Sequence, residues 1–315
     1  MASLVQPAVD LIGFPQIHTP GLLSYLKRTG QEEFYKSVVE ARGAGIPDGL
    51  ILCSFYAKLC YRSLVEGQNA NVTRVRGIED NVKGAFGHGH GSVFEHANVN
   101  FVVSNCSRVY THEQVRHRVS PPRGNENELD SDLSGTGPAY SQTSGRFCRL
   151  DHIDLVHDPI LDDCKDIILD HLGATEDAVY LMECRKGLRK PNPAAPGADM
   201  TDWFRLRDEA HKWVPDNSKD FGYRKKVTSA IRRIAPNGQS NEMGMTLNIR
   251  TLRHLVQLRT QGAAEWEIRS IYYQVYCLTK AVFPLMYFDA RERVVDDLPE
   301  VYGMRVQPYE HVPAA

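Results

Sequence analysis

The stretch FEHANVNFVVSNCSRVYTHEQVRHR, residues 94–118, passes from a strand pattern into a helix pattern. Between Asn98 and Val103 apolar residues alternate with polar ones, which predicts a strand with one buried face. Ser107 follows as a candidate N-cap, and the helix after it runs up to the Arg-His-Arg run at 116–118. The sequence therefore predicts a buried strand that leads directly into a helix ending in a cluster of cations.

Helical patterns surround this stretch on both sides. Apolar residues recur at intervals of three and four, and we expect helices within residues 21–42, 48–61, 151–188, 248–260 and 268–282. Residues 1–45, with scattered Pro and Gly, are interpreted as an N-terminal extension that carries the first of these helices. Because strands and helices mix without an alternating βαβ rhythm, the predicted fold class is α+β, a mixed or antiparallel sheet flanked by helices.

The composition is typical of a soluble globular protein with a sizeable core. Of the 315 residues, 42% are hydrophobic and 24% charged, and the net charge of −2 with a pI near 6.6 disfavours a globally basic nucleic-acid binder. No apolar run reaches the roughly 20 residues that cross a bilayer, and no signal-peptide pattern opens the chain. Seven cysteines, odd in number and without a CxxC pair, indicate reduced thiols in a cytoplasmic protein.

Four clusters of polar residues stand out. The first is GHGHGSVFEH, whose histidines are His88, His90 and His96. It leaves three interpretations open: a metal site without a common spacing, a turn whose glycines let an imidazole stack on a flat ligand, or a plain turn before the strand. The second cluster is Arg-His-Arg at 116–118, and the third is Ser-Gly-Arg at 144–146, which can hold a phosphate.

The fourth cluster lies on the predicted helix NIRTLRHLVQLR. Arg250 and His254 are i,i+4 neighbours on one face, and Arg259 falls in the last turn. Taken alone, these side chains are equally well explained as cations near a helix C-terminus. An acidic, glycine- and proline-rich segment separates the second cluster from the third, which raises the question of why two anion-binding groups flank it.

Taken together, the clusters resemble the flavin-dependent thymidylate synthase family, in that family's order along the chain. The matching segments are AKLCYRS at 57–63, HGHGSVFEH at 88–96, SRVYTHEQVRHR at 107–118, SGRF at 144–147, IRRIAP at 231–236, LNIRTLRHLVQLR at 247–259 and AAEWEIR at 263–269. The resemblance makes residues 46–315 a single flavin-dependent uridylate methylase domain. Residues 119–143 are then an insert between two halves of one site; a rival alignment places DLSG (132–135) on the third motif, but no arginine follows it.

The resemblance implies methylation of C5 of a uracil nucleotide without a cysteine nucleophile. FAD and methylenetetrahydrofolate would supply the methyl group, and NADPH would reduce the flavin. None of the seven cysteines follows a proline, as the nucleophile of the older thymidylate synthases does. A homotetramer whose subunits share each active site is also implied, with no nucleic-acid or membrane partner and no metal.

By position, the resemblance assigns two overlapping sets of residues. It implies flavin contacts from His90, Ser92, Arg116, His117, Arg118, Gln142, Asn248, Arg250 and His254. It implies nucleotide contacts from Glu113, Arg116, Gln142, Thr143, Ser144, Gly145, Arg146, Arg232 and Arg259. Arg259 matches the family's activating arginine, which places a fixed cation beside the pyrimidine and stabilises negative charge that develops on the ring.

Three positions beside the expected nucleotide depart from the family's pattern: Glu113, Gln142 and Thr143. Gln142 stands where the family has a glutamate, and its amide can donate to a 2′-hydroxyl, whereas a carboxylate only accepts. We therefore expect UMP to be accepted as well as dUMP, with a strictly dUMP-specific thymidylate synthase as the alternative. A nucleic-acid-binding module and a catalytically inactive nucleotide-binding relative are two further alternatives.

Overall fold

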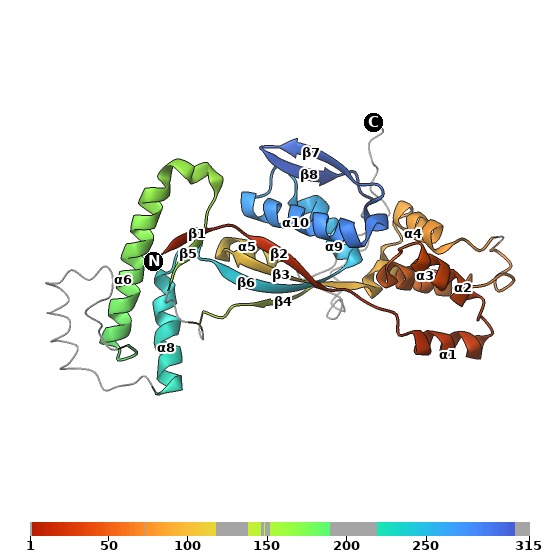
Figure 1. The fold of residues 1–315 in the computed structure, drawn as a ribbon, viewed down its shortest axis with the longest axis horizontal. Helices are drawn as coiled ribbons and strands as arrows, with labels where there is room; N and C mark the ends of the chain where they lie inside the picture. Colours follow the sequence, from red (N-terminus) through yellow and green to blue (C-terminus); the bar gives the residue numbers. More distant parts are fainter. Residues whose placement is uncertain are drawn as a thin grey trace, which may run out of the picture. The chain divides into compact units, whose positions relative to one another are not determined.

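The structure is a computed structural model that describes residues 2–72, 74–117, 138–145, 148, 152–189 and 219–305 (Figure 1). Its chain divides into two compact units. Unit 1 consists of Met1–Pro7, Ser104–Glu113 and Gln142–Met243, and unit 2 of Ala8–Val103, Gln114–Ser141 and Gly244–Ala315. The residues interpreted as an N-terminal extension therefore fall mostly within unit 2, together with the segment that follows them.

A four-stranded sheet with the strand order β2-β3-β6-β4 forms the base of unit 2. Its strands are β2 (Ala8–Gly13), β3 (Asn98–Cys106), β6 (Asn241–Asn248) and β4 (Ala139–Gln142), and all except β2 continue into unit 1. The alternation predicted for β3 is confirmed, because Val99, Phe101 and Val103 are buried. β4 lies within the predicted insert, so the described end of that insert is part of the sheet.

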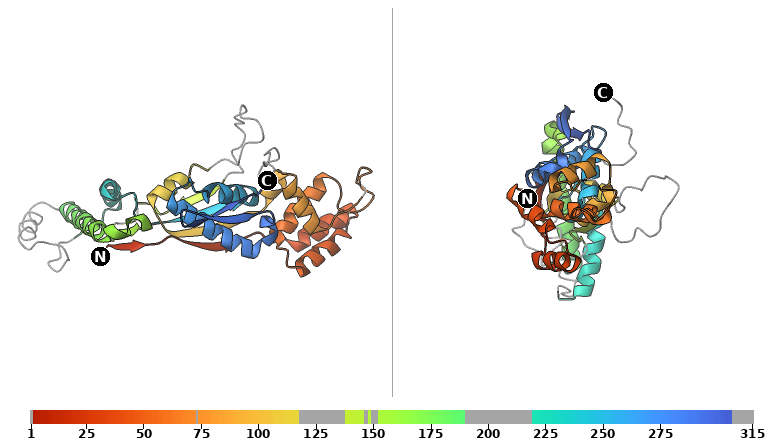
Figure 2. Two further views of the ribbon diagram at one scale, coloured as in Figure 1. Left: turned by 90° about the horizontal axis from the view of Figure 1, so that it is seen from above. Right: turned by 90° about the vertical axis from the view of Figure 1, so that its right-hand side faces the viewer.

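The N-terminal helices of unit 2 form one group (Figure 2). They are α1 (Thr19–Thr29), α2 (Phe34–Gly43), α3 (Asp48–Cys60) and α4 (Ile78–Gly87), followed by the 3₁₀ helix η1 (Gly91–His96). The helix expected within 21–42 is in fact two helices. Gly30 ends α1 with φ of 67°, a left-handed conformation that only glycine adopts without strain, and its N–H bonds to carbonyls of the last turn.

The predicted C-terminal helices are confirmed as α9 (Ile249–Arg259) and α10 (Trp266–Val282). Asn248 caps α9, since its side-chain oxygen accepts a hydrogen bond from Thr251 N at 2.8 Å. α10 packs against α9 and β2 within unit 2 (Figure 1). The 3₁₀ helix η4 (Pro284–Tyr287) then leads into an antiparallel hairpin of β7 (Arg291–Val295) and β8 (Leu298–Tyr302), which the sequence did not reveal.

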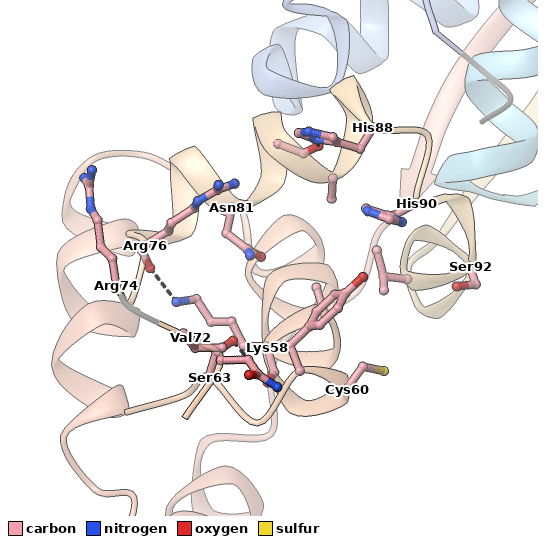
Figure 3. A pocket seen from close by; sticks show the side chains of 16 residues that line it. Lys58, Cys60, Ser63, Val72, Arg74, Arg76, Asn81, His88, His90 and Ser92 are labelled. Carbon is pink, nitrogen blue, oxygen red and sulfur yellow. Dashed lines mark hydrogen bonds between the residues drawn. The ribbon is translucent and has the colours of Figure 1, made fainter. Parts of the chain in front are cut away.

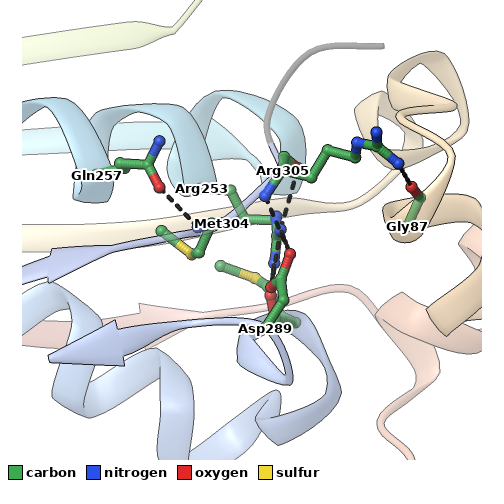
Figure 4. Close-up of polar contacts among 7 residues, drawn as sticks. Gly87, Arg253, Gln257, Asp289, Met304 and Arg305 are labelled. Carbon is green, nitrogen blue, oxygen red and sulfur yellow. Dashed lines mark hydrogen bonds and ion pairs between the residues drawn. The ribbon is translucent and has the colours of Figure 1, made fainter. Parts of the chain in front are cut away.

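Arg253, in the middle of α9, anchors that helix to the C-terminal segment (Figure 4). Its side chain is only 2% exposed, pairs with both carboxylate oxygens of Asp289, and also donates to the backbone carbonyls of Met286 and Arg305. The guanidinium carbon lies 4.3 Å from the centre of the Phe86 ring. Among the arginines of α9, Arg253 therefore has a structural role.

Unit 1 combines short strands with two longer helices. β1 (Ser3–Val5) pairs in parallel with β5 (Asp154–Val156), and η2 (Pro159–Cys164) leads into α6 (Lys165–Arg185). α8 (Phe221–Ile231) and the 3₁₀ helix η3 (Arg232–Ile234) follow, and α5 (Arg108–Gln114) belongs to unit 1 except for its last residue. A small apolar core joins α6 to α8 through Val179, Leu188, Val227 and Ile231.

The helix expected across 151–188 is shorter than predicted, because Asp154–Val156 pairs with β1 instead. That partner lies about 150 residues away in sequence, and local periodicity does not detect such a pairing. The α+β class itself is confirmed, with an antiparallel hairpin and helices packed on a sheet. Within the described residues, no helix has the length and apolar character needed to cross a membrane.

Candidate active site

Arg250 lies in the first turn of α9, and its guanidinium forms an ion pair through Nη1 while its Nε has no partner among the described residues. Its Nη1 lies 2.5 Å from Glu95 Oε1, and the side chain is 8% exposed. Its Nε is buried and has no hydrogen-bond partner within the described chain. A Cβ on Gly91 would stand 2.6 Å from that Nε, so a glycine is required where η1 passes the guanidinium. The unpaired Nε–H of Arg250 is therefore free to donate a hydrogen bond to a polar group of a bound cofactor such as FAD.

Arg259, at the other end of α9, is held by His117. Its Nε and Nη2 lie 2.8 and 2.6 Å from His117 Nε2. A guanidinium only donates, so this ring nitrogen must be unprotonated and His117 must be the neutral tautomer that accepts. Burial lowers the pKa of His117 to about 4, helped by the charge of Arg259 and by His254. His117 therefore stays neutral at physiological pH and can accept hydrogen bonds from the guanidinium of Arg259.

His254 lies on the same helix between these two arginines. Burial lowers its pKa, and the charges of Arg250 and Arg259 lower it further. α9 thus carries Arg250, His254 and Arg259, and the charges of both arginines act on His254. These cationic groups favour a ligand that carries negative charge.

A hydrogen-bond chain of three residues, not recognised from the sequence, positions His117. Tyr272 Oη donates to Gln114 Oε1 at 2.9 Å, and Gln114 Nε2 donates to Tyr140 Oη at 3.0 Å. Tyr140 Oη in turn donates to the backbone carbonyl of His117 at 2.9 Å. Because Gln114 and Tyr272 are fully buried, this chain connects the backbone of His117 to α10 within unit 2.

The three histidines of the glycine-rich turn do not converge on one point. The ring of His96 stacks on Tyr56 with centroids 3.8 Å apart, and His88 and His90 face each other at 5.9 Å. The described part of the chain contains no group of three His, Cys, Asp or Glu side chains arranged to hold a metal ion. His90 and Ser92 are exposed and line a cavity, so both are available to a ligand (Figure 3).

Unit 1 carries a second cationic group around Gly145. A Cβ on Gly145 would lie 3.4 Å from Arg232 Cδ and 3.7 Å from Arg108 Nη2, so two arginines flank this backbone. Burial and the neighbouring Arg232 charge lower the pKa of Arg108. Two guanidinium groups beside an unhindered glycine can together hold a phosphate. Sequence reasoning missed Arg108, although it lies in the motif segment that begins at Ser107.

Arg108 also fixes the orientation of the Gln142 side chain. Its Nη1 donates to Gln142 Oε1 at 3.0 Å, and its Nη2 donates to the backbone carbonyl of Thr143 at 2.9 Å. Since an arginine cannot accept, the atom that faces it must be the amide oxygen. The Thr143 hydroxyl lies within hydrogen-bond distance of the Glu242 backbone, which joins β4 to β6.

The remaining predicted site residues either lie outside the described residues or occupy the positions given below. Arg118, Arg146 and residues 119–137 of the insert lie outside the described residues. Arg116 is exposed, Glu113 lies in the last turn of α5, and Ser144 is exposed beside Gly145. The predicted flavin residues gather in unit 2, apart from Gln142, whereas Gln142, Ser144, Gly145 and Arg232 gather in unit 1.

The chain is similar to known proteins over most of its length. The model of the family described as thymidylate synthase complementing protein matches residues 44–285. A flavin-dependent thymidylate synthase of Mycolicibacterium gilvum is 26% identical over 258 residues, which cover 80% of this chain and 84% of that protein. The same enzyme of Clostridium tetani is 23% identical over 231 residues, or 73% and 78% of the two chains.

Two solved structures are similar at a lower level. The UMP/dUMP methylase PolB from Streptomyces cacaoi, bound with 5-Br dUMP, has 14% identity and a TM-score of 0.49 over 90% of this chain and 95% of that chain. Thymidylate Synthase X from Helicobacter pylori, with FAD and dUMP, has 14% identity and a TM-score of 0.39 over 76% and 94%.

Arg259 is held by a neutral imidazole, and Arg250, at the other end of α9, is paired with Glu95 and lies close to Gly91; both arginines could contact anionic ligands. The chain belongs to the thymidylate synthase complementing protein family, since the match covers most of its length. The resemblance predicted from its motifs is confirmed, and the protein is an enzyme of the flavin-dependent thymidylate synthase type.

Proposed function

We propose that this enzyme methylates C5 of the uracil ring in UMP and dUMP, with methylenetetrahydrofolate as carbon donor and NADPH as reductant. The observation that supports this most directly is the Arg259–His117 pair, a fixed cation on the helix that also carries Arg250. FAD, when bound, supplies the redox chemistry that completes the methyl group. We also propose the homotetramer that the family resemblance implies.

Residues of unit 2 hold the flavin and activate the pyrimidine in this proposal. Arg250 donates its orphaned Nε to the flavin, which Gly91 lets approach, and the exposed His90 and Ser92, on either side of Gly91 in sequence, add further flavin contacts. Arg259 faces the uracil ring and stabilises the negative charge that develops when C5 attacks an electrophile. His117 aims the guanidinium and is too weak a base to take a proton above about pH 4.

Residues of unit 1 bind the nucleotide through its phosphate. Arg108 and Arg232 supply two guanidinium groups on either side of Gly145, whose lack of a side chain lets a phosphate reach the backbone. Arg108 is thus an addition to the residues inferred from the motifs.

Acceptance of the ribonucleotide rests on Gln142. Its oxygen is already occupied by Arg108, which leaves the amide Nε2 without a partner among the described residues. An amide N–H can donate to a ribose 2′-hydroxyl, whereas the glutamate of the family would form an ion pair with Arg108 and could only accept. Discrimination by one hydroxyl commonly depends on such a single polar contact.

Measuring kcat/KM with UMP and with dUMP tests this proposal. We expect both nucleotides to be methylated, with kcat/KM values within about 10³-fold of each other. That limit corresponds to a difference of roughly 4 kcal/mol in transition-state stabilisation. The variant Gln142→Glu should lower kcat/KM for UMP and leave dUMP nearly unchanged. A stronger preference for dUMP in the parent enzyme would establish the strictly dUMP-specific thymidylate synthase instead. Absence of methylation with either nucleotide would establish an inactive relative.

A Cys→Ser substitution at each of the seven positions should leave methylation within about tenfold of the parent enzyme. Burial raises the pKa of the Cys53 thiol to about 12, which keeps it protonated at neutral pH. Cys148 is the most informative position, because it is exposed and lies close enough to Arg108 to interact with its charge. Loss of turnover in a folded Cys148→Ser protein would overturn the mechanism without a cysteine nucleophile.

A further inference from the structure

His117 lies just beyond the end of α5, where two hydrogen bonds hold its backbone. Its N–H donates to the carbonyl of Gln114 at 3.1 Å, and its own carbonyl accepts from Tyr140 Oη at 2.9 Å. The first bond closes a turn within the same segment. The second reaches a residue 23 positions away, so it ties the backbone of His117 to a different element of the fold.

That element is β4, which lies beside β6 in the four-stranded sheet (Figure 1). β6 ends at Asn248, the cap of α9, so the strand next to Tyr140 leads directly into the helix that carries Arg259. A side chain mounted on a strand is held more precisely than one on a loop. The sheet that supports α9 therefore also supports, through Tyr140, the backbone of His117.

The hydrogen bonds behind Tyr140 have a fixed direction. A backbone carbonyl can only accept, so Tyr140 must donate to His117 and accept from Gln114 Nε2 at 3.0 Å. The amide oxygen of Gln114 then faces Tyr272, which must donate, and burial raises the pKa of Tyr272 so that it keeps its proton. Because Gln114 and Tyr272 are fully buried, these bonds hold the Tyr140 hydroxyl in one orientation.

We propose that Tyr140 is a positioning residue for methylation: its hydroxyl fixes the backbone of His117 so that the imidazole holds the Arg259 guanidinium toward the pyrimidine. Arg259 donates to His117 Nε2 at 2.8 and 2.6 Å, and a shift of the His117 backbone would lengthen both bonds. This inference rests on the proposed function, because that function gives Arg259 its task. Tyr140 lies within residues 119–143, so the predicted insert contributes a side chain to the site that it was expected to divide.

The pKa of His117 tests the inference without turnover. Burial, the charge of Arg259 and His254 hold this pKa at about 4. Tyr140→Phe keeps the ring and removes the hydroxyl, so the imidazole should move away from Arg259, and an NMR titration should show the pKa of His117 raised toward its ordinary value. Tyr25→Phe is the matched control: it preserves the edge-on contact of that ring with Phe55 on α3 and should leave the pKa of His117 at the parent value.

Steady-state kinetics show whether the position of His117 matters for methylation. Tyr140→Phe should lower kcat about tenfold, since a small misplacement of an aligned group slows the reaction. FAD affinity and KM for the nucleotide should stay unchanged, because Arg250 and the phosphate-binding residues of unit 1 are not altered. In an Arg259→Ala background the same substitution should have no further effect, since Tyr140 acts through the Arg259–His117 pair. Independent, additive losses in the double variant would overturn the inference.

The NMR titration also separates this inference from the proposed function. An unchanged pKa of His117 in folded Tyr140→Phe protein would overturn the inference. If that variant does not fold, Tyr272→Phe interrupts the same hydrogen bonds at their far end and should raise the pKa of His117 by a smaller amount; no rise there would overturn the inference as well. A raised pKa in a protein that methylates no nucleotide contradicts only the proposed function.

Discussion

Replacing Arg259 with alanine is expected to lower kcat/KM for methylation on the order of 10²-fold or more while FAD remains bound. The structure gives the reason: two guanidinium nitrogens are held at 2.8 and 2.6 Å by His117 Nε2, so the charge is fixed before the substrate arrives. A charge oriented in advance stabilises a developing anion without reorganisation during the reaction. Steady-state kinetics with the flavin spectrum recorded on the same sample measure both effects.

The same variant also tests the contact between Arg259 and His117. A nearby positive charge disfavours protonation, so its removal should raise the pKa of His117 from about 4 toward the ordinary value, as an NMR titration of the imidazole would show. Arg28→Ala, on the exposed face of α1, serves as control and should change neither quantity. If Arg259→Ala instead releases flavin or unfolds the protein, Arg259 is a structural or cofactor residue.

Replacing Gly91 with alanine is expected to weaken FAD binding about 5- to 150-fold, as follows from an overpacking cost of roughly 1–3 kcal/mol. The new Cβ would stand 2.6 Å from Arg250 Nε and 3.0 Å from its Cδ, so the guanidinium must move away from the position in which it pairs with Glu95. Equilibrium titration of the apoprotein with FAD measures the loss.

Gly87→Ala provides the matched control for this substitution. Gly87 ends α4 only a few residues earlier, and a Cβ there would meet nothing within 4 Å. FAD affinity should therefore stay at the parent value, and thermal unfolding should show both variants folded. Equal FAD affinity for Gly91→Ala and the parent would mean that Arg250 does not contact the flavin.

The parts of the fold that the sequence predicts are those defined by local patterns. β3 buries every second residue from Val99 to Val103, Ser107 caps α5 by accepting a 3.0 Å hydrogen bond from Tyr110 N, and α9 and α10 have helical periodicity. These features depend on neighbours within a few residues, which the sequence displays directly. For the same reason, Arg250, His254 and Arg259 could be placed on one helix before the structure was known.

The features that the sequence did not predict depend on distant partners. β5 forms because it pairs with β1, and the orientation of Gln142 is set by Arg108, 34 residues earlier. The burial of the unpaired Arg250 Nε likewise depends on the packing of η1 against α9, which the sequence does not display. The family motifs indicate Arg250 and Gln142 as site residues. They do not indicate the roles of Glu95, Arg108 and Gln114, because these roles depend on tertiary contacts.

The anchoring of Arg253 has a consequence for how ligands meet α9. A guanidinium bound to Asp289 and two backbone carbonyls leaves this helix little freedom to shift or rotate, because any movement would strand a buried charge. Ligands that contact Arg250 or Arg259 then lose little entropy in ordering the protein, and more of their interaction energy remains as affinity. The C-terminal segment, through Asp289 and the carbonyl of Arg305, thus restrains the helix that carries Arg250 and Arg259.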